Sequence, residues 1–229
     1  MKASVVKIIC FSLSLWIQGF SVIGQDLEKD LKMMSDYYSK ADNFSMRVDI
    51  AAFRSNTITV FNKTAVLKKR KDHFWYKIDD TEMIVQPEAM VMINEQEKEI
   101  TVRSIEKKEW ERLYQQTYTS GIDSISKYYD SLQYQQENNE KKYTVYSAKS
   151  LISKAELVFS QTGDLLSIQY WYDQKKYKQL SRVKIQFSMT ALKAGEEQLF
   201  KQERVVLKDE KIYRPVGKYQ SYNLKLVDL

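Results

Sequence analysis

Apolar and polar residues alternate with a period of two along most of the chain after Phe44. Met46, Val48 and Ile50 are separated by Arg47 and Asp49. Such alternation is typical of strands that bury one face and expose the other. The clearest example is the run of Val183, Ile185, Phe187 and Met189, which alternates with polar residues. Counting all such runs, we predict about ten strands joined by short polar turns. These include strands over residues 82–86 and 199–207 and a hairpin turn at residues 161–164.

Two regions have a helical period instead. In residues 26–43, Leu27, Leu31, Met34 and Tyr38 recur every three or four positions, which predicts an amphipathic helix that begins after Asp26 as its N-cap. Residues 104–132 repeat this spacing on both sides of Gly121 and predict two further helices.

The order of these elements indicates the fold class. Between Phe44 and Val102, no helical pattern of ten residues separates consecutive strands, so antiparallel pairing is expected there. Strands with one apolar face outnumber the helices that could cover them. We therefore predict an α+β fold in which a curled antiparallel sheet forms an open half-barrel, covered by the N-terminal helix and the central helical insertion. Residues 25–229 are expected to form a single domain.

The first residues have the pattern of a secretory signal peptide. Lys2 and Lys7 precede an apolar run over residues 8–20, which is too short to span a bilayer as a helix, and Val22-Ile23-Gly24 offers a cleavage site. We predict that residues 1–24 are removed and that the mature chain is periplasmic. Cys10 is the only cysteine, so the mature chain would have no disulfide, catalytic thiol or lipid-anchoring cysteine.

Charge and composition exclude several classes of function. The formal net charge is only +6, and the charges are mixed along the chain. We interpret the one basic cluster, residues 68–71, as a solvated turn, and expect no nucleic acid partner. His73 is the only histidine and no G-x-S-x-G motif occurs, so we do not expect an enzyme. No cofactor or metal site is expected, because one histidine and no mature cysteine leave few ligands.

The order of segments resembles the LolA family of periplasmic lipoprotein carriers. The resemblance covers residues 26–207: one amphipathic helix, the aromatic strand HFWYKI at 73–78, the run AMVMINEQEKEITV at 89–102, a helical insertion and the hairpin series LVFSQTGDLLSIQYWY at 157–172. The resemblance implies a half-barrel closed by helices around a cavity that holds acyl chains. An arginine that gates the ligand in the family has two approximate counterparts, Arg47 and Arg54.

Methionine and aromatic residues are the candidate ligand-binding residues. Methionine side chains adapt to varied shapes, so they suit a cavity for flexible chains. The alternative is that the same residues are ordinary core packing. The candidates are Met34, Met46, Phe74, Tyr76, Met90, Met92, Tyr170 and Met189.

Two functions follow. The first is a periplasmic protein, a monomer, that binds or carries a lipid or the acyl chains of a lipoprotein and that docks on an inner- or outer-membrane protein. The second is an envelope protein-protein interaction module with a collapsed core and no ligand. In the second case the tyrosine-rich segments 37–38, 128–129 and 170–177 would form the contact surface, because tyrosine combines large area with a polar tip.

Overall fold

The computed structural model describes residues 27–55, 58–111, 129–209 and 212–227. These residues divide into two compact units. The first contains residues 27–37, 53–58 and 129–184, and the second contains 38–52, 59–111 and 185–227. The expected signal peptide lies outside the described residues. Within these ranges, no helix combines the length and the apolar character that a bilayer span requires.

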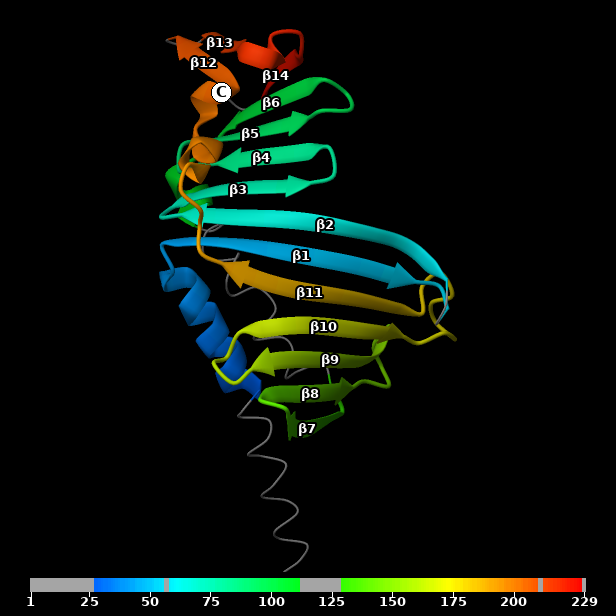
Figure 1. Cartoon of the computed structure of the whole chain (residues 1–229). Coiled ribbons are helices and arrows are strands. Elements are labelled where there is room, and N and C mark those ends of the chain that lie inside the picture. The colour runs from blue at the N-terminus through cyan, green and yellow to red at the C-terminus, as the bar shows by residue number, and fades with distance from the viewer. Residues whose placement is uncertain (1–26, 56–57, 112–128, 210–211, 228–229) are drawn as a thin grey trace, which may run out of the picture. The chain divides into compact units, whose positions relative to one another are not determined.

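The first unit is a meander of antiparallel strands with a helix against it (Figure 1). Consecutive strands pair in the order β7 to β10 through tight hairpins. The turn between β9 and β10 is the predicted Gln161-Thr162-Gly163-Asp164, in which Gly163 adopts φ 93°. The strands are β7 (Ser131–Glu137), β8 (Glu140–Tyr146), β9 (Ile152–Ser160) and β10 (Leu165–Tyr172).

The N-terminal helix spans residues 27–40, as its periodicity predicts, and residues 27–37 belong to the first unit. Leu27 and Leu31 are buried on its apolar stripe. Asp30 lies between them and is also buried, where it accepts a 2.6 Å hydrogen bond from the Tyr143 hydroxyl and a 2.8 Å bond from Lys141 Nζ. The helix is thus held on β8 by an ionic contact as well as by leucine packing.

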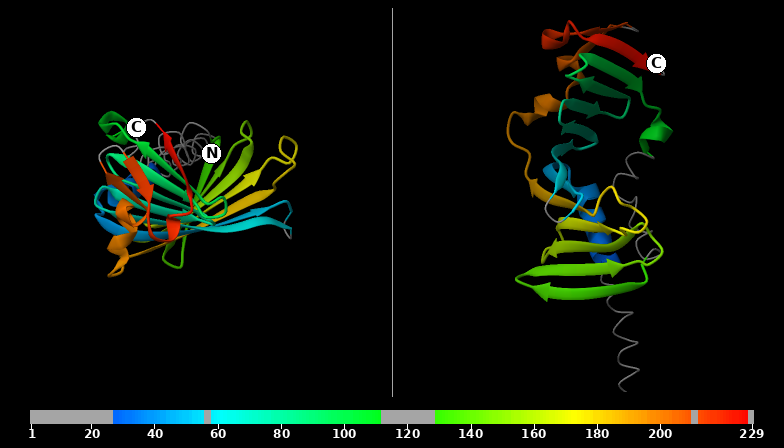
Figure 2. Two further views of the ribbon diagram at one scale, coloured as in Figure 1. Left: turned by 90° about the horizontal axis from the view of Figure 1, so that it is seen from above. Right: turned by 90° about the vertical axis from the view of Figure 1, so that its right-hand side faces the viewer.

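The second unit contains a large sheet with the strand order β14-β6-β5-β4-β3-β2-β1-β11, seen from two further directions in Figure 2. A separate two-stranded sheet pairs β12 with β13. The strands are β1 (Asn43–Phe53), β2 (Thr59–Arg70), β3 (His73–Ile78), β4 (Thr81–Val85), β5 (Ala89–Asn94), β6 (Glu99–Ser104), β11 (Arg182–Thr190), β12 (Val206–Asp209), β13 (Ile212–Pro215) and β14 (Asn223–Val227).

Short helices complete the second unit. A helix begins at residue 107 and is described to residue 111. We call the described chain after residue 190 the C-terminal segment. It contains three 3₁₀ helices: η1 (Glu196–Phe200), η2 (Gln202–Arg204) and η3 (Gly217–Tyr219). The described chain is therefore mostly sheet with few helices, which agrees with the predicted class of a large antiparallel sheet.

One face of the second unit's sheet is buried across β4, β5 and β6 under the C-terminal segment, whereas Leu226 of β14, beside Val102 on the same face, is 48% exposed. Ile84, Val91 and Val102 are cross-strand neighbours on this face and have no exposed area. Phe200, Val205 and other apolar residues of the C-terminal segment pack on them. The buried members of this core are Trp75, Ile84, Val91, Ile93, Ile100, Val102, Phe200, Val205, Val206 and Tyr219.

Three sequence-based expectations about the elements were wrong. The pairing is not entirely antiparallel, because β14 returns alongside β6 in the parallel sense. Residues 199–205, which were predicted as the start of a strand, form 3₁₀ turns instead, since Phe200 and Val205 reach the core by irregular spacing. The predicted second central helix cannot extend to residue 132, because β7 begins at Ser131, and the rest of it lies outside the described residues.

The basic run 68–71 was also misinterpreted as a solvated turn. Lys68 and Lys69 lie inside β2, and only Lys71 and Asp72 make the turn. Lys69 is 1% exposed and donates through Nζ to the carbonyl oxygens of Tyr38 and Ser39, at 3.3 and 2.9 Å. Carbonyls at a helix C-terminus lack intrahelical donors, so this ammonium caps the end of the N-terminal helix.

Candidate ligand-binding site

The second face of the second unit's sheet carries the methionines and aromatics of the predicted site. Register places Phe74 beside Val85 and Val85 beside Met90, while Tyr76 lies beside Met83 and Met83 beside Met92. Leu67 of β2 is opposite Tyr76. We call this set the methionine face: Leu67, Phe74, Tyr76, Met83, Met90 and Met92.

The methionine face is less covered by described residues than the core face. Phe74, Val85 and Ile105 are buried, and the rings of Phe74 and Trp110 lie 6.0 Å apart by their centroids. Farther from this contact, Tyr76, Met83 and Met90 are half-buried and Met92 is 37% exposed. The face therefore runs from a packed end, under the helix that begins at residue 107, to an end where soft apolar side chains remain partly open.

Tyr76 occupies an apolar setting in the middle of this face. Burial raises the pKa of Tyr76 from 10.0 to about 12, because the phenolate is poorly solvated there. The low polarity that disfavours a phenolate also favours a hydrocarbon ligand.

The Tyr76 shift predicts an alkaline loss of stability. Because the folded-state pKa lies above the unfolded value, the stability is fully present below pH 10 and is lost as pH rises toward 12 and beyond. A two-unit shift corresponds to about 3 kcal/mol. We expect the Tyr76→Phe variant to lose less stability than the wild type in urea denaturation between pH 10 and 12. Difference absorbance at 295 nm should assign the late-titrating phenol to Tyr76, and equal alkaline profiles for both proteins would contradict the prediction.

The structure places the eight predicted residues in several settings. Four of them, Phe74, Tyr76, Met90 and Met92, are gathered on the methionine face. The other second-unit residues are Met46, buried in β1, and Met189, half-buried in β11. Met34 and Tyr170 belong to the first unit. Both are half-buried, and burial, with Tyr172 nearby, raises the pKa of Tyr170.

The predicted set omitted Leu67, Met83, Ile105 and Trp110. Met83 was within reach of sequence reasoning, because the Asp79-Asp80 turn sets the β3–β4 register that puts Met83 beside Tyr76. Trp110 was not, because a contact between a helix and a strand face leaves no local pattern. Two arginines were possible counterparts of the arginine that gates the ligand in the LolA family. Arg47 follows Met46 in β1, so its side chain lies on the face of β1 opposite to Met46, where it pairs with Asp49 at 2.9 Å. Arg54 lies exposed after β1, in the first unit.

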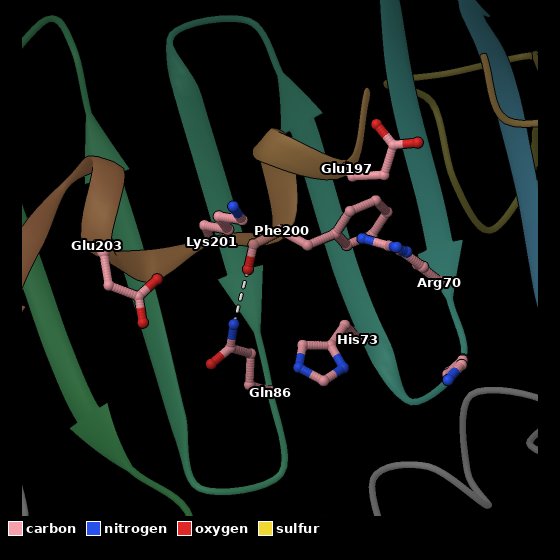
Figure 3. Close-up of a pocket in the computed structure, with 8 residues that line it drawn as sticks. Arg70, His73, Gln86, Glu197, Phe200, Lys201 and Glu203 are labelled. Carbon is pink, nitrogen blue, oxygen red and sulfur yellow. Dashed lines mark hydrogen bonds between the residues drawn. The ribbon is translucent and has the colours of Figure 1, made fainter. Parts of the chain in front are cut away.

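A polar pocket lies at one end of the second unit's sheet (Figure 3). It has a volume of about 650 Å³ and is bordered by the β2–β3 turn, β4 and the first two 3₁₀ helices. Gln86, directly after β4, donates from Nε2 to the carbonyl oxygen of Phe200 in η1 at 2.7 Å. This hydrogen bond links the end of β4 to η1 at the pocket. The lining residues are Arg70, Lys71, His73, Gln86, Glu197, Phe200, Lys201 and Glu203.

Charges around this pocket are mixed. His73 is the only histidine of the chain, and its Nδ1 lies 2.7 Å from Asp72 Oδ1. Beside the pocket, Lys68 donates to Glu196 at 2.6 Å, and this hydrogen bond lowers the pKa of the Glu196 carboxyl. Within the described residues, no three histidine, cysteine or acidic side chains gather as a metal-binding group.

A second pocket of about 580 Å³ adjoins the first, since Gln86 and Glu203 line both. It lies between β5, β6 and the β12–β13 hairpin, and its walls include Val206, Leu207 and Tyr213. Both pockets are on the side of the C-terminal segment, so neither includes any residue of the methionine face.

Comparison with known proteins was informative only at the level of structure. No family model matches the sequence, and no curated protein matches it. Similar solved structures include a LolA superfamily protein from Nitrosomonas europaea, with 8% identity, coverage of 79% of this chain and 99% of that chain, and a TM-score of 0.33. The lipoprotein LppX of Mycobacterium tuberculosis is similar at 10% identity, over 72% of this chain and 94% of that one, with a TM-score of 0.38.

The complex of MucA and MucB from Pseudomonas aeruginosa is another similar structure. Its identity is 13%, the match covers 76% of this chain and 60% of that chain, and the TM-score is 0.46. A LolA superfamily protein is thus one of the solved structures to which this chain is similar.

Proposed function

We propose that this protein binds an acyl chain, of a lipid or of an acylated protein, on the methionine face, and that it carries this ligand in the periplasm. The observation that carries the proposal is the contrast between the two faces of one sheet. The core face is closed by large apolar residues of the C-terminal segment, whereas the methionine face keeps Met92 and its neighbours partly open. A hydrocarbon that covers Met83, Met90 and Met92 would remove apolar area from water, which stabilises the complex by about 25 cal/mol for each Å² buried.

The composition of this face supports a flexible ligand. Three methionines beside Tyr76 and Leu67 provide unbranched, polarizable side chains that can follow an acyl chain of varied length. Register also places Lys69 beside Phe74 and Arg103 beside Met90, where Lys69 donates to the Ser39 carbonyl oxygen and Arg103 pairs with Glu109. The role that we propose for this face is binding. The open half-barrel with its helical cover, the single domain from residue 25 and the monomeric state remain parts of this proposal. The periplasmic location rests on the signal-peptide pattern of residues 1–24.

A charge on the methionine face should block the proposed ligand. We expect wild-type protein from an envelope fraction to carry lipid in native mass spectrometry and to bind a fluorescent fatty acid. The Met92→Asp variant should bind that probe at least tenfold more weakly, because a carboxylate would have to lose water beneath the hydrocarbon. Met92 is partly exposed, so the substitution should leave the fold intact by circular dichroism.

Met33→Asp is the matched control. Met33 is exposed on the N-terminal helix of the first unit, so the same change should leave probe binding within twofold of the wild type. A wild-type protein that is empty and does not bind the probe would refute the acyl-chain proposal. It would favour the interaction module with a collapsed core instead.

A further inference from the structure

Three loops of the first unit are joined into one surface, which we call the loop cluster: the described residues 53–55 and 58, with 147–151 and 173–182. The Ser181 amide donates to the Phe53 carbonyl oxygen at 2.7 Å, and the Asp173 amide donates to the Leu151 carbonyl oxygen at 2.9 Å. In Figure 1 these loops follow the ends of β1, β8 and β10. Segments more than 100 residues apart in sequence therefore present their side chains together.

Side-chain bonds hold the loop cluster in a defined shape. Lys176 Nζ donates to the carbonyl oxygens of Ala148 and Ser150, at 2.8 and 3.3 Å, and so ties two of the loops together. Gln174 Nε2 lies within hydrogen-bond distance of the carbonyl oxygens of Tyr172, at the end of β10, and of Tyr177 and Leu180 in its own loop, the closest being that of Leu180 at 2.9 Å. The cluster is thus built before any partner arrives, which lowers the entropy cost of binding.

The loop cluster is strongly basic. Its described residues include one acid, Asp173, which is bonded to the Lys175 amide and lies 3.5 Å from Lys176 Nζ. Of the basic residues, all but Arg182 are exposed. They are Arg54, Lys149, Lys175, Lys176, Lys178 and Arg182. This concentration of charge contrasts with the mild balance of the whole chain.

Apolar side chains accompany these charges. Leu151 is 54% exposed and Ile58 is 55% exposed, although both belong to residue types that usually lie inside a protein. Tyr177 is half-buried in the same surface, with its ring centroid 5.1 Å from that of Tyr172. Exposed aliphatic residues and a tyrosine among basic groups match the composition of surfaces that lie at the boundary between lipid headgroups and water.

Acidic residues lie at the opposite ends of β8 and β10. The β7–β8 turn carries Glu137 and Glu140, the β9–β10 turn carries Asp164, and the described residues 137–140 and 160–164 hold no basic side chain. An anionic surface would therefore attract one end of the first unit and repel the other. This polarity would orient the unit as well as hold it.

We propose that the loop cluster binds the surface of a bilayer that contains anionic phospholipids. Each lysine or arginine near such a surface contributes a favourable interaction with the headgroups, and Leu151 and Ile58 would add shallow apolar insertion. The proposal goes beyond acyl-chain binding, since it concerns a different surface in the other unit and would hold for a protein that carries no ligand.

Vesicle sedimentation tests this proposal directly. We expect the wild-type protein to sediment with vesicles of phosphatidylcholine and phosphatidylglycerol, to bind vesicles of phosphatidylcholine alone at least tenfold more weakly, and to be released at high salt. The Lys175→Glu/Lys178→Glu variant should lose at least tenfold in affinity for the anionic vesicles. Neither lysine side chain has a hydrogen bond or ion pair within the described structure, so the fold should be unaffected.

The matched control reverses the charge of two lysines elsewhere in the same unit. Lys29 and Lys32 are exposed on the N-terminal helix, and Lys29→Glu/Lys32→Glu changes the net charge by the same amount. This control should keep binding within twofold of the wild type. If both double variants lose binding equally, net charge rather than the loop cluster is responsible and the proposal is wrong. It is also wrong if the wild type ignores anionic lipid.

Leu151→Ser separates apolar insertion from charge attraction. We expect this variant to bind anionic vesicles a few-fold more weakly while its salt dependence stays unchanged. Fatty-acid probe binding by all loop-cluster variants should equal that of the wild type, so failure of the membrane proposal and failure of the acyl-chain proposal can be told apart.

Discussion

Replacing Glu82 with alanine is expected to lower the free energy of unfolding of the second unit by about 4 kcal/mol, near the range for removing one partner of a buried ion pair. Glu82 lies in β4 and is 6% exposed. One of its carboxylate oxygens, Oε1, accepts a 2.5 Å hydrogen bond from Trp75 Nε1 and an ion-paired bond from Arg204 Nη2. The alanine variant would leave the partly buried Arg204 guanidinium and the Trp75 indole without this acceptor.

Urea denaturation followed by tryptophan fluorescence should measure this loss, since Trp75 itself reports on the site. Glu82→Gln keeps an acceptor for Trp75 but removes the charge opposite Arg204, so it should lose about half as much stability. Glu97→Ala is the matched control, because Glu97 is exposed in the β5–β6 turn, and it should change stability by less than about 0.5 kcal/mol. A Glu82→Ala variant as stable as this control would mean that the contact does not hold the C-terminal segment on the sheet.

Glu82 also marks the limit of what local pattern can predict. Alternation identified β4 correctly, and it separates Met83 and Val85 from Glu82 and Ile84. Both pairs contain large apolar residues, however, so the pattern cannot tell which face is covered by protein. Which face is covered depends on Arg204, more than 100 residues later, which pairs with Glu82. Arg204 lies in a segment that was predicted to be a strand and that forms 3₁₀ turns.

The candidate site was predictable to the extent that it depends on strand periodicity. Phe74 and Tyr76 share a face because they are two residues apart, and Met90 and Met92 share one for the same reason. Hairpin register then brings the two pairs together across β4. Met34 and Tyr170 were chosen by residue type alone, and no local rule related them to these strands. The burial of Lys68 and Lys69 was missed because a basic run at the end of a strand has the same appearance as a solvated turn.

Replacing Asp30 with alanine is expected to lower the free energy of unfolding of the first unit by about 3 kcal/mol, because it removes a buried carboxylate that two side chains bind. Asp30 is 3% exposed, with the Tyr143 hydroxyl at 2.6 Å and Lys141 Nζ at 2.8 Å. Lys141 is partly exposed and can turn toward water after the substitution. Tyr143 is buried at 1% exposure and would lose this hydrogen bond, so a large part of the cost should come from the Asp30–Tyr143 pair.

A double-mutant cycle tests this division. Tyr143→Phe alone should cost about 1 to 2 kcal/mol in urea denaturation. The double variant should cost clearly less than the sum of the two single effects, because both substitutions remove the same hydrogen bond. Glu28→Ala, an acid-to-alanine change at an exposed position of the same helix, should be nearly neutral. Strict additivity of the two single effects would show that Asp30 and Tyr143 act independently. The hydrogen bond between their side chains would then contribute nothing to the docking of the N-terminal helix on β8.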